Sequence, residues 1–330
     1  MRTLFCVALL GLIALAVAVP AGQARTEFTA WMQKYNKQYA TDAEFQHRFQ
    51  VYMQNKERVA QMNRAKPANA NTEWGVTKFM DLTPEEFKSF LGTKVNENAE
   101  KPAPVDLDTL QQSLPSTFDW RSSSSCVSAV KNQGNCGSCW AFSTTEGTES
   151  AYCIATGKLY TLAPQELVSC DNTCDGCNGG EVTAALNYVE KNGLEGESSY
   201  PYTSGTTGQN GKCTYSSSAV EATVTSWGYS TQTKNETAMQ VSMYSISPLA
   251  VVVDAQSWQF YKGGIVTSNC GTNLDHAVQA VGWNQAGSTP YWIVRNSWGA
   301  DWGEEGYIWV EMFKNMCGIA SQPLYVQYKK

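Results

Sequence analysis

One cysteine of the sequence lies in a setting that suits nucleophilic chemistry. Cys139 occurs in Gln133-Gly-Asn-Cys-Gly-Ser-Cys-Trp-Ala-Phe-Ser, where Gly137 and Ser138 permit a tight turn before a helix. A thiol at a helix N-terminus faces unpaired amides, whose partial positive charge favours the thiolate and so activates the nucleophile. The alternative is that Cys139 is half of a structural disulfide, the usual fate in a cysteine-rich secreted chain.

A base for this thiol has few candidates, because the chain contains only two histidines, His47 and His276. His276 stands in Leu-Asp-His-Ala-Val at the entry to an apolar strand, where its ring could face a cleft. Asn296, in Asn-Ser-Trp-Gly, follows another apolar strand, and its side-chain carbonyl can orient an imidazole by accepting from its N–H. A lone histidine is more often structural, so the hypothesis depends on the three residues together.

The elements that must hold these residues change character along the chain. Helical patterns at 140–156 and 182–190 dominate up to about residue 200. Strand-like runs then follow at Ala219–Thr225, Leu249–Asp254, Ala277–Trp283, Tyr291–Val294 and Tyr307–Val310. A helical half followed by a strand half predicts an α+β fold of two subdomains with a cleft between them.

The region before these elements has a different composition. Residues 25–92 contain no cysteine and are expected to be helical, with aromatic residues at helical spacing at Phe28, Trp31, Tyr35 and Tyr39. Thr83-Pro-Glu-Glu predicts a helix start. Residues 93–113, rich in Asn, Glu, Pro and Asp, are expected to form an exposed, cleavable linker.

The first residues predict a secretory signal. Arg2 precedes an apolar run from Leu4 to Val19, and small residues follow it up to Ala24. The alternative is a transmembrane anchor, but the run is short for one and no basic residues follow it. We expect the mature protein to be soluble, because no second run of this kind occurs.

Charge and cysteine content narrow the function classes further. The net charge of −6 and the lack of a basic stripe argue against a nucleic-acid partner. Apart from Cys6, the cysteines all follow residue 125, and in an oxidising compartment such a set is mostly a disulfide framework.

The Cys139, His276 and Asn296 motifs together resemble those of the papain-like cysteine proteases, cathepsin L type. The resemblance extends to the N-terminal region. Glu44, Arg48, Tyr52, Asn55, Val59 and Asn63 are similar to the family's helical inhibitor pattern, with Tyr and Val in place of the commoner Phe and Ile. Residues 75–81 resemble its companion motif, and Leu114-Pro115 with Phe118–Arg121 resembles the mature N-terminus. The resemblance implies a signal peptide at 1–24, an inhibitory propeptide at 25–113 and a mature papain-like domain at 114–330.

The family's catalytic roles carry over residue by residue. Cys139 would be the nucleophile, His276 the base and Asn296 its orienting partner, with the first two resting as thiolate and imidazolium. Gln133 would donate its amide to the oxyanion together with the Cys139 main-chain N–H, and Trp298 would cover the His276–Asn296 hydrogen bond. Neither a metal nor a cofactor is implied.

The family's substrate-binding positions are implied in the same way. Gly179 and Gly180 match a loop that pairs with the substrate as an extended strand. The pocket for the second side chain before the scissile bond comprises Val182, Val252, Leu274 and Gln322, with Glu181 near its rim. We expect a preference for Leu, Val or Phe there, and hypothesise that Glu181 lets some Arg bind; the alternative is a solvated Glu that points away.

The resemblance also implies the disulfides Cys136–Cys177, Cys170–Cys213 and Cys270–Cys317. It leaves Cys126, Cys153 and Cys174 unplaced, and two of these could form an extra bridge. A rival interpretation makes the cysteines between residues 170 and 177 a zinc knuckle, but no fourth ligand lies nearby in the sequence.

The activity implied is that of a monomeric endopeptidase acting on proteins and peptides and inhibited by its own propeptide. Exopeptidase relatives close the cleft with inserted loops or a further domain, and this chain has no spare histidine and no room for such a domain. We expect no nucleic-acid or membrane partner. Asn235 begins a glycosylation sequon, which agrees with a secretory route to lysosome-like vesicles or to the exterior.

Two other functions make different predictions for this sequence. A non-catalytic binding or storage protein on this scaffold predicts the loss of Cys139, His276, Asn296 or Gln133, and none is lost. A peptide ligase would use the same thioester intermediate, so the sequence does not separate ligation from hydrolysis.

Overall fold

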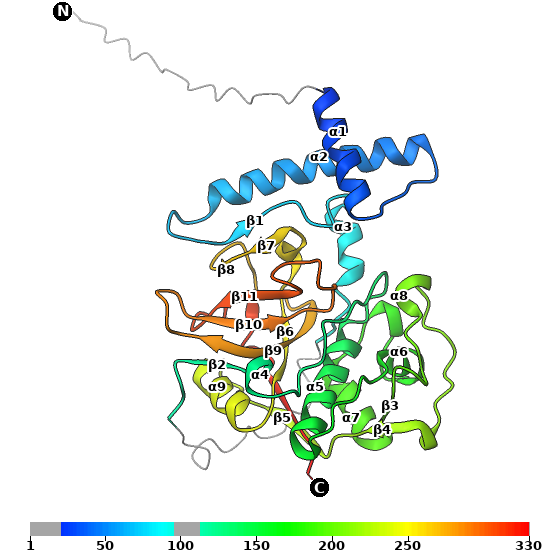
Figure 1. Cartoon of the computed structure of the whole chain (residues 1–330), viewed down its shortest axis with the longest axis vertical. Coiled ribbons are helices and arrows are strands. Elements are labelled where there is room, and N and C mark those ends of the chain that lie inside the picture. Colours follow the sequence, from blue (N-terminus) through cyan, green and yellow to red (C-terminus); the bar gives the residue numbers. More distant parts are fainter. Residues whose placement is uncertain (1–20, 96–112, 330) are drawn as a thin grey trace, which may run out of the picture.

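The structure is a computed structural model that describes residues 21–95 and 113–329. Residues 21–95 are called the N-terminal segment below, and residues 113–329 are called the body. The segment begins with helices α1 (Ala21–Lys34) and α2 (Asp42–Ala65). These helices lie at one end of the molecule, and the chain after helix α3 (Pro84–Phe87) runs down into the body (Figure 1). The signal peptide expected at 1–24 lies almost wholly outside the described residues, and its last positions belong to α1.

An aromatic cluster joins α1 to α2. Phe28 is fully buried, with its ring 5.2 Å from that of Tyr52 on α2 and 5.6 Å from that of Trp31. The Thr41 hydroxyl caps α2 by accepting from the Glu44 amide at 3.1 Å. The expected helical run through Tyr39 is wrong, because α1 ends at Lys34 and Tyr39 reaches Phe28 from a loop.

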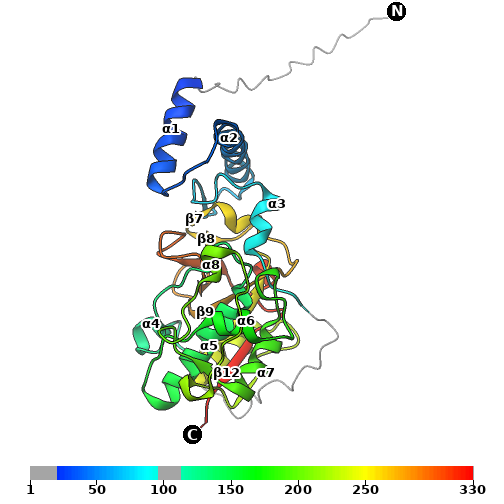
Figure 2. The ribbon, with the colours of Figure 1, turned by 90° about the vertical axis from the view of Figure 1, so that its right-hand side faces the viewer.

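The segment then turns toward the body. Residues 66–82 form turns and irregular structure, which corrects the expectation of helix throughout 25–92, and the short strand β1 (Glu73–Trp74) pairs with a strand of the body. Helix α3 (Pro84–Phe87) begins at the predicted Thr83, and Glu86 completes a capping box. A 3-10 turn, η1 (Lys88–Phe90), follows and leads down to the body (Figure 2).

Helices form one half of the body. The helix predicted to start at Cys139 is α5 (Cys139–Thr156), which is buried over most of its length. The remaining helical elements are α4 (Trp120–Ser123), α6 (Pro164–Cys170), η3 (Gly176–Asn178), α7 (Val182–Asn192), α8 (Ser204–Thr207) and η4 (Ser217–Ala219). A two-stranded sheet of β3 (Leu194–Glu195) and β4 (Val220–Ala222) lies among them.

The other half is an eight-stranded sheet. Its order is β5-β12-β6-β9-β10-β11-β8, and β2 also pairs with β9. These strands are β2 (Thr117–Asp119), β5 (Ser226–Tyr229), β6 (Leu249–Val253), β8 (Ile265–Val266), β9 (His276–Asn284), β10 (Tyr291–Arg295), β11 (Tyr307–Glu311) and β12 (Leu324–Gln327). Strand β7 (Tyr261–Gly263) pairs with β1, while α9 (Glu236–Ser245), η5 (Gln256–Phe260) and η6 (Met316–Gly318) connect the strands.

The two halves meet along α5, which packs against β9 and β12. In Figure 1 the helices α5 to α8 lie on one side of this seam and strands β8 to β11 on the other. The α+β arrangement of a helical and a strand subdomain is therefore confirmed, and Cys139 and His276 begin elements on opposite sides of the seam. Among residues 21–95 and 113–329, no helix is both long and apolar enough to cross a bilayer.

Candidate active site

Cys139 is the first residue of α5, and its thiol is unpaired and fully buried. From the N-terminal segment, the Thr93 hydroxyl oxygen lies 3.1 Å from its Sγ. Burial raises the pKa of the thiol, while hydrogen bonds from Thr93 and from main-chain groups of Ala277, Gly92 and Trp140 oppose the rise. Ala277 directly follows His276, so the thiol lies beside the start of β9.

His276 is oriented by its two neighbours from the loop after β10. Its Nε2 lies 2.8 Å from Oδ1 of Asn296, and the Trp298 ring stacks on the imidazole with a centroid distance of 4.7 Å. Since Asn Oδ1 can only accept, Nε2 carries the proton and Nδ1 is the free, basic nitrogen of the neutral ring. Nδ1 is buried without a hydrogen-bond partner. Burial lowers the His276 pKa to about 4, although Asn296 opposes this shift.

The thiolate–imidazolium pair expected during catalysis stays a prediction, because the structure describes the chain with its N-terminal segment in place. With the N-terminal segment in place, burial favours a neutral thiol on Cys139 and a neutral imidazole on His276, rather than a thiolate–imidazolium pair. The physical reason is the loss of water, because both side chains are fully buried in this form.

Gln133 lies at the same site, with its side-chain amide already engaged. Nε2 donates to the main-chain carbonyls of Phe90, at 3.0 Å, and Cys136, at 2.9 Å. Its Oε1 accepts from the Ser297 hydroxyl at 2.8 Å, which fixes the direction of the amide. A donor held in this way suits an oxyanion, and here a carbonyl of the N-terminal segment occupies it.

The end of the N-terminal segment runs along the site as a strand. Gly180 donates its N–H to Gly92 O and accepts from Lys94 N, both at 2.9 Å. Thr93 is buried and donates its N–H to Asp275 O at 3.0 Å. The expectation of an exposed linker from residue 93 is therefore wrong at its start, because these residues pair with the body. Residues 96–112 lie outside the described part.

Both predicted glycines allow this close approach. Gly179 has a φ of +114°, and a Cβ there would lie 2.4 Å from Gly92 O. A Cβ on Gly180 would lie 2.6 Å from the Trp140 ring and 2.7 Å from Cys174 Sγ. A larger residue at Gly179 would therefore push the paired strand away, whereas one at Gly180 would clash with Trp140 and Cys174 of the body.

Residues expected to line the specificity pocket lie near Val95 of this strand. Val182 and Val252 are buried in one apolar cluster, against which Leu274 and Val95 pack. Leu274 and Gln322 line a cavity of about 810 Å³ together with Val95. Glu181 lies at the N-cap of α7, is half-buried, and receives no hydrogen bond from the helix amides to its side chain.

The cysteines pair as the resemblance implied, with one addition. The structure contains Cys136–Cys177, Cys170–Cys213 and Cys270–Cys317. The extra bridge joins Cys126 to Cys153, and Cys174 is free. The zinc-knuckle interpretation is wrong, because Cys170 and Cys177 are in separate disulfides; among the described residues no cluster suited to a metal was found.

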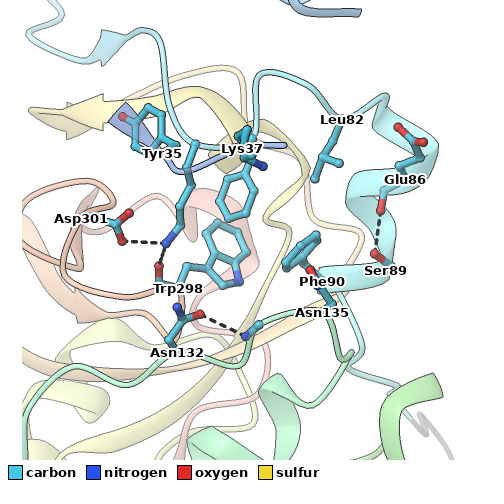
Figure 3. Close-up of a pocket in the computed structure, with 13 residues that line it drawn as sticks. Tyr35, Lys37, Leu82, Glu86, Ser89, Phe90, Asn132, Asn135, Trp298 and Asp301 are labelled. Carbon is cyan, nitrogen blue, oxygen red and sulfur yellow. Dashed lines mark hydrogen bonds and ion pairs between the residues drawn. The ribbon is translucent and has the colours of Figure 1, made fainter. Parts of the chain in front are cut away.

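Trp298 also anchors the N-terminal segment. The rings of Phe79 and Phe87 meet it edge-on, at centroid distances of 5.3 and 5.4 Å. Beside these rings is a cavity of about 590 Å³, lined by both the segment and the body (Figure 3). Figure 3 shows Leu82, Glu86 and Phe90 facing Asn132 and Trp298 across it.

Several residues at the site were not singled out from the sequence. Gly92 and Thr93 lie where the region expected to be helical meets the expected linker, and neither is given a role there. A glycine shortly after a predicted helix is nevertheless a signal for close approach. Ser297 stood within the Asn296 motif without a role. Asp301, which Lys78 of the segment contacts at 2.7 Å, had no sequence signal, because surface carboxylates are common.

Comparison with known proteins agrees with this geometry. Residues 114–327 match the model of the papain family cysteine proteases, and residues 28–87 match the cathepsin propeptide inhibitor domain. Cysteine proteinase 1 of Dictyostelium discoideum is 40% identical over 318 residues, which cover 90% of this chain and 91% of that protein. Cysteine proteinase 15A of Pisum sativum is 39% identical over 322 residues, covering 90% and 85%.

Solved precursor structures match as well. Digestive procathepsin L 3 of Tenebrio molitor larval midgut superposes with a TM-score of 0.81 at 29% identity, covering 92% of this chain and 99% of that one. A recombinant stem bromelain precursor gives a TM-score of 0.80 at 32% identity, covering 93% and 100%. The chain therefore belongs to the papain family of cysteine proteases and is made as a zymogen with a cathepsin-type inhibitory propeptide.

Proposed function

We propose that the mature enzyme is an endopeptidase in which Cys139 is the nucleophile and His276 the acid and base. The observation that carries this proposal is the buried His276–Asn296 hydrogen bond of 2.8 Å, which leaves Nδ1 without a partner on the residue before Ala277, whose main chain hydrogen-bonds to the Cys139 thiol. Residues 1–24 would be the signal peptide, 25–113 the inhibitory propeptide and 114–330 the mature enzyme. The enzyme would act as a monomer on protein and peptide substrates, and its catalysis would use no metal or cofactor.

The reaction follows from these positions. Once the segment leaves, water and the helix N-terminus favour transfer of the Cys139 proton to His276 Nδ1. The thiolate attacks the peptide carbonyl carbon, and the oxyanion takes the Gln133 donor that now binds Phe90 O. His276 protonates the leaving amine as the C–N bond breaks, giving a thioester. Water, deprotonated by His276, then attacks the thioester and releases the acid and the thiol.

The side-chain preference is proposed from the cluster that receives Val95. Val182, Val252 and Leu274 would surround the second side chain before the scissile bond and favour Leu, Val or Phe. Gln322 adds a polar, uncharged end to the same pocket. Glu181 lies next to Val182 and is half-buried, which supports some acceptance of Arg. The test is a peptide library varied at this position. Absence of cleavage after Arg-containing sequences, or cleavage of them that Glu181→Leu leaves unchanged, would contradict the role of Glu181.

Secretion and glycosylation are proposed from Asn235. The residue is exposed, and its Oδ1 caps α9 by accepting from Thr237 N at 3.0 Å and Ala238 N at 3.2 Å. This hydrogen bonding uses the oxygen of the side chain and leaves the amide nitrogen for a glycan. The route would end in lysosome-like vesicles or outside the cell. Glycosylation is tested by treating the protein with a glycosidase, which should lower the mass of the wild type and leave the mass of Asn235→Gln unchanged.

The test of the function is activation of the full-length chain at acid pH. We expect a new N-terminus near residues 112–115, together with cleavage of a peptide that a thiol-directed inhibitor blocks. Addition of an amine acceptor would show whether the thioester is also used for ligation. A processed chain that cleaves no peptide would overturn the proposal.

A further inference from the structure

A lysine of the propeptide occupies a small cation site on the body. The Lys78 ammonium donates to the main-chain carbonyl of Trp298 and to Oδ1 of Asp301, the latter at 2.7 Å. The dashed lines that end on Trp298 and Asp301 in Figure 3 are these contacts. The Lys78 side chain is only 15% exposed, whereas the Asp301 side chain remains 56% exposed even with the lysine in place.

The body provides the space for this ammonium. Gly299 lies between the two oxygens with a φ of +79°, and a Cβ there would lie 2.8 Å from Asp301 Oδ1 and 3.3 Å from Lys78 Nζ. A glycine therefore keeps open the space beside the ammonium. Gly299 N donates to Lys131 O at 2.9 Å, and Trp298 forms a bridge with Asn132, so the mature domain itself holds this loop.

The site lies on the leaving-group side of Cys139. The propeptide passes from Phe90, on Gln133, to Thr93, at Cys139, and then to Lys94, on Gly180. The strand at Gly180 and the nearby apolar pocket would receive residues before the scissile bond. Asp301 follows Trp298, which stacks on His276 on the opposite flank, where the residues after the scissile bond must lie.

We propose that the Asp301 carboxylate and the Trp298 carbonyl form a subsite for a Lys or Arg side chain of the substrate, within three residues after the scissile bond. The inference rests on the proposed peptidase function and adds a second element of specificity to it. When the propeptide leaves, an acceptor pair remains that is partly shielded by the Trp298 loop. An ion pair of this exposure accounts for about a two- to fivefold preference.

Internally quenched peptides test the subsite directly. Each peptide carries Leu at the second position before the bond and differs only in Lys, Arg or Gln at one of the three positions after it. For the acid-activated wild-type enzyme we expect the Lys-to-Gln ratio of kcat/KM to reach about two to five at one position. The ratio should fall toward one in Asp301→Asn and as salt rises to 1 M.

Asp175→Asn is the matched control. Asp175 also pairs with a propeptide lysine, Lys94, at 3.3 Å, but on the Gly180 side, so this variant should keep the wild-type ratio. No preference for Lys or Arg in the wild type, or a preference that survives in Asp301→Asn, would overturn the subsite. Absence of cleavage of every peptide by the processed wild type would instead overturn the peptidase function itself.

Discussion

Gly92 of the propeptide lies directly against the main chain of Gly137, two residues before the proposed nucleophile. A Cβ on Gly92 would fall 1.8 Å from Gly137 O and 2.7 Å from Gly137 Cα. On the other side, Gly92 O accepts from Gly180 N at 2.9 Å. No side-chain movement can relieve such a clash, because the atoms that the Cβ would meet belong to the main chain of Gly137, next to the disulfide-bonded Cys136.

Gly92→Ala should therefore weaken autoinhibition. The clash forces a backbone shift of the kind that costs about 1–3 kcal/mol, which raises the open fraction about 5- to 150-fold. The measurement is the rate at which a small thiol-directed probe labels Cys139 in the full-length zymogen at neutral pH. Gly287→Ala, in the body, is the control, since a Cβ there meets nothing within 4 Å. Equal labelling rates for Gly92→Ala and wild type would contradict this account of the contact.

Acid should open the zymogen, because burial lowers the His276 pKa in the closed form. In the closed form burial lowers this pKa to about 4, whereas an open site restores it toward 6.5. Between these values the open form binds more protons, so opening becomes more favourable as pH falls from about 6.5 to 4. Burial tends to raise the Glu86 pKa, but the hydrogen bond from Arg48 opposes burial and the pKa is lowered. Protonation of Glu86 in acid weakens the Arg48–Glu86 ion pair, so this pair also favours opening at low pH.

Probe labelling of Cys139 across pH 4 to 8, corrected for the intrinsic pH dependence of the probe on the mature enzyme, measures this linkage. The expected open fraction rises steadily toward pH 4. An open fraction that is flat, or that rises toward pH 8, would show that His276 is not desolvated in the zymogen.

A buried ion pair joins α5, which begins at Cys139, to β10, which ends just before Asn296. Glu146 on α5 lies 3.3 Å from Arg295 on β10, and both side chains are almost fully buried. Burial raises the Glu146 pKa to about 7, against the opposing charge of Arg295. Since the folded pKa lies above the unfolded value, the stability that Glu146 contributes is present below about pH 4.5 and is lost as pH rises through 7.

Arg295→Met should destabilise the full-length chain by about 3–5 kcal/mol at pH 8, because it leaves Glu146 without its partner. The loss should be smaller at pH 5, where Glu146 can remain protonated. Denaturant unfolding of the Cys139→Ser background measures both. Arg64→Met, which breaks the exposed Arg64–Glu57 pair, should change stability by less than about 0.5 kcal/mol at either pH. A pH-independent loss in Arg295→Met would sink the linkage.

The extra disulfide should contribute measurably to stability. Cys126 and Cys153 close a loop with a sequence separation of 27, for which loop entropy gives about 3 to 4 kcal/mol. The double variant Cys126→Ser/Cys153→Ser should lose this amount in denaturant unfolding. Cys174→Ser, which removes a thiol without opening a loop, should lose far less, and equal losses would argue against the bridge.

Local patterns predicted the framework of the site well. The Gly137-Ser138 turn and the residues that follow it predicted the start of α5 at Cys139, and the apolar run after His276 predicted β9. These features depend on neighbours in the chain. The pairing of Cys126 with Cys153 does not, because it depends on where the far end of α5 meets a distant loop.

The propeptide was harder to interpret for the same reason. Tyr39 has helical spacing from Tyr35, yet it leaves the helix and stacks on Phe28 at 6.1 Å. Thr93 has a linker-like sequence, but its hydroxyl and main chain are buried against Cys139 and Asp275. Burial by a partner surface outweighs local propensity in both cases.

The assignment of Cys139 as the nucleophile is tested most directly by comparing Cys139 with Cys174, the two free thiols of the described residues. Cys139→Ser and Cys174→Ser are processed to the mature form, with a trace of active enzyme supplied where needed and then removed, and kcat/KM is measured on the Leu-containing peptide. We expect Cys139→Ser to lose activity by about 10³-fold or more and to resist thiol-directed probes, while Cys174→Ser keeps both activities. A Cys139→Ser enzyme with wild-type turnover, or loss of activity in Cys174→Ser alone, would contradict the assignment of Cys139 as the nucleophile.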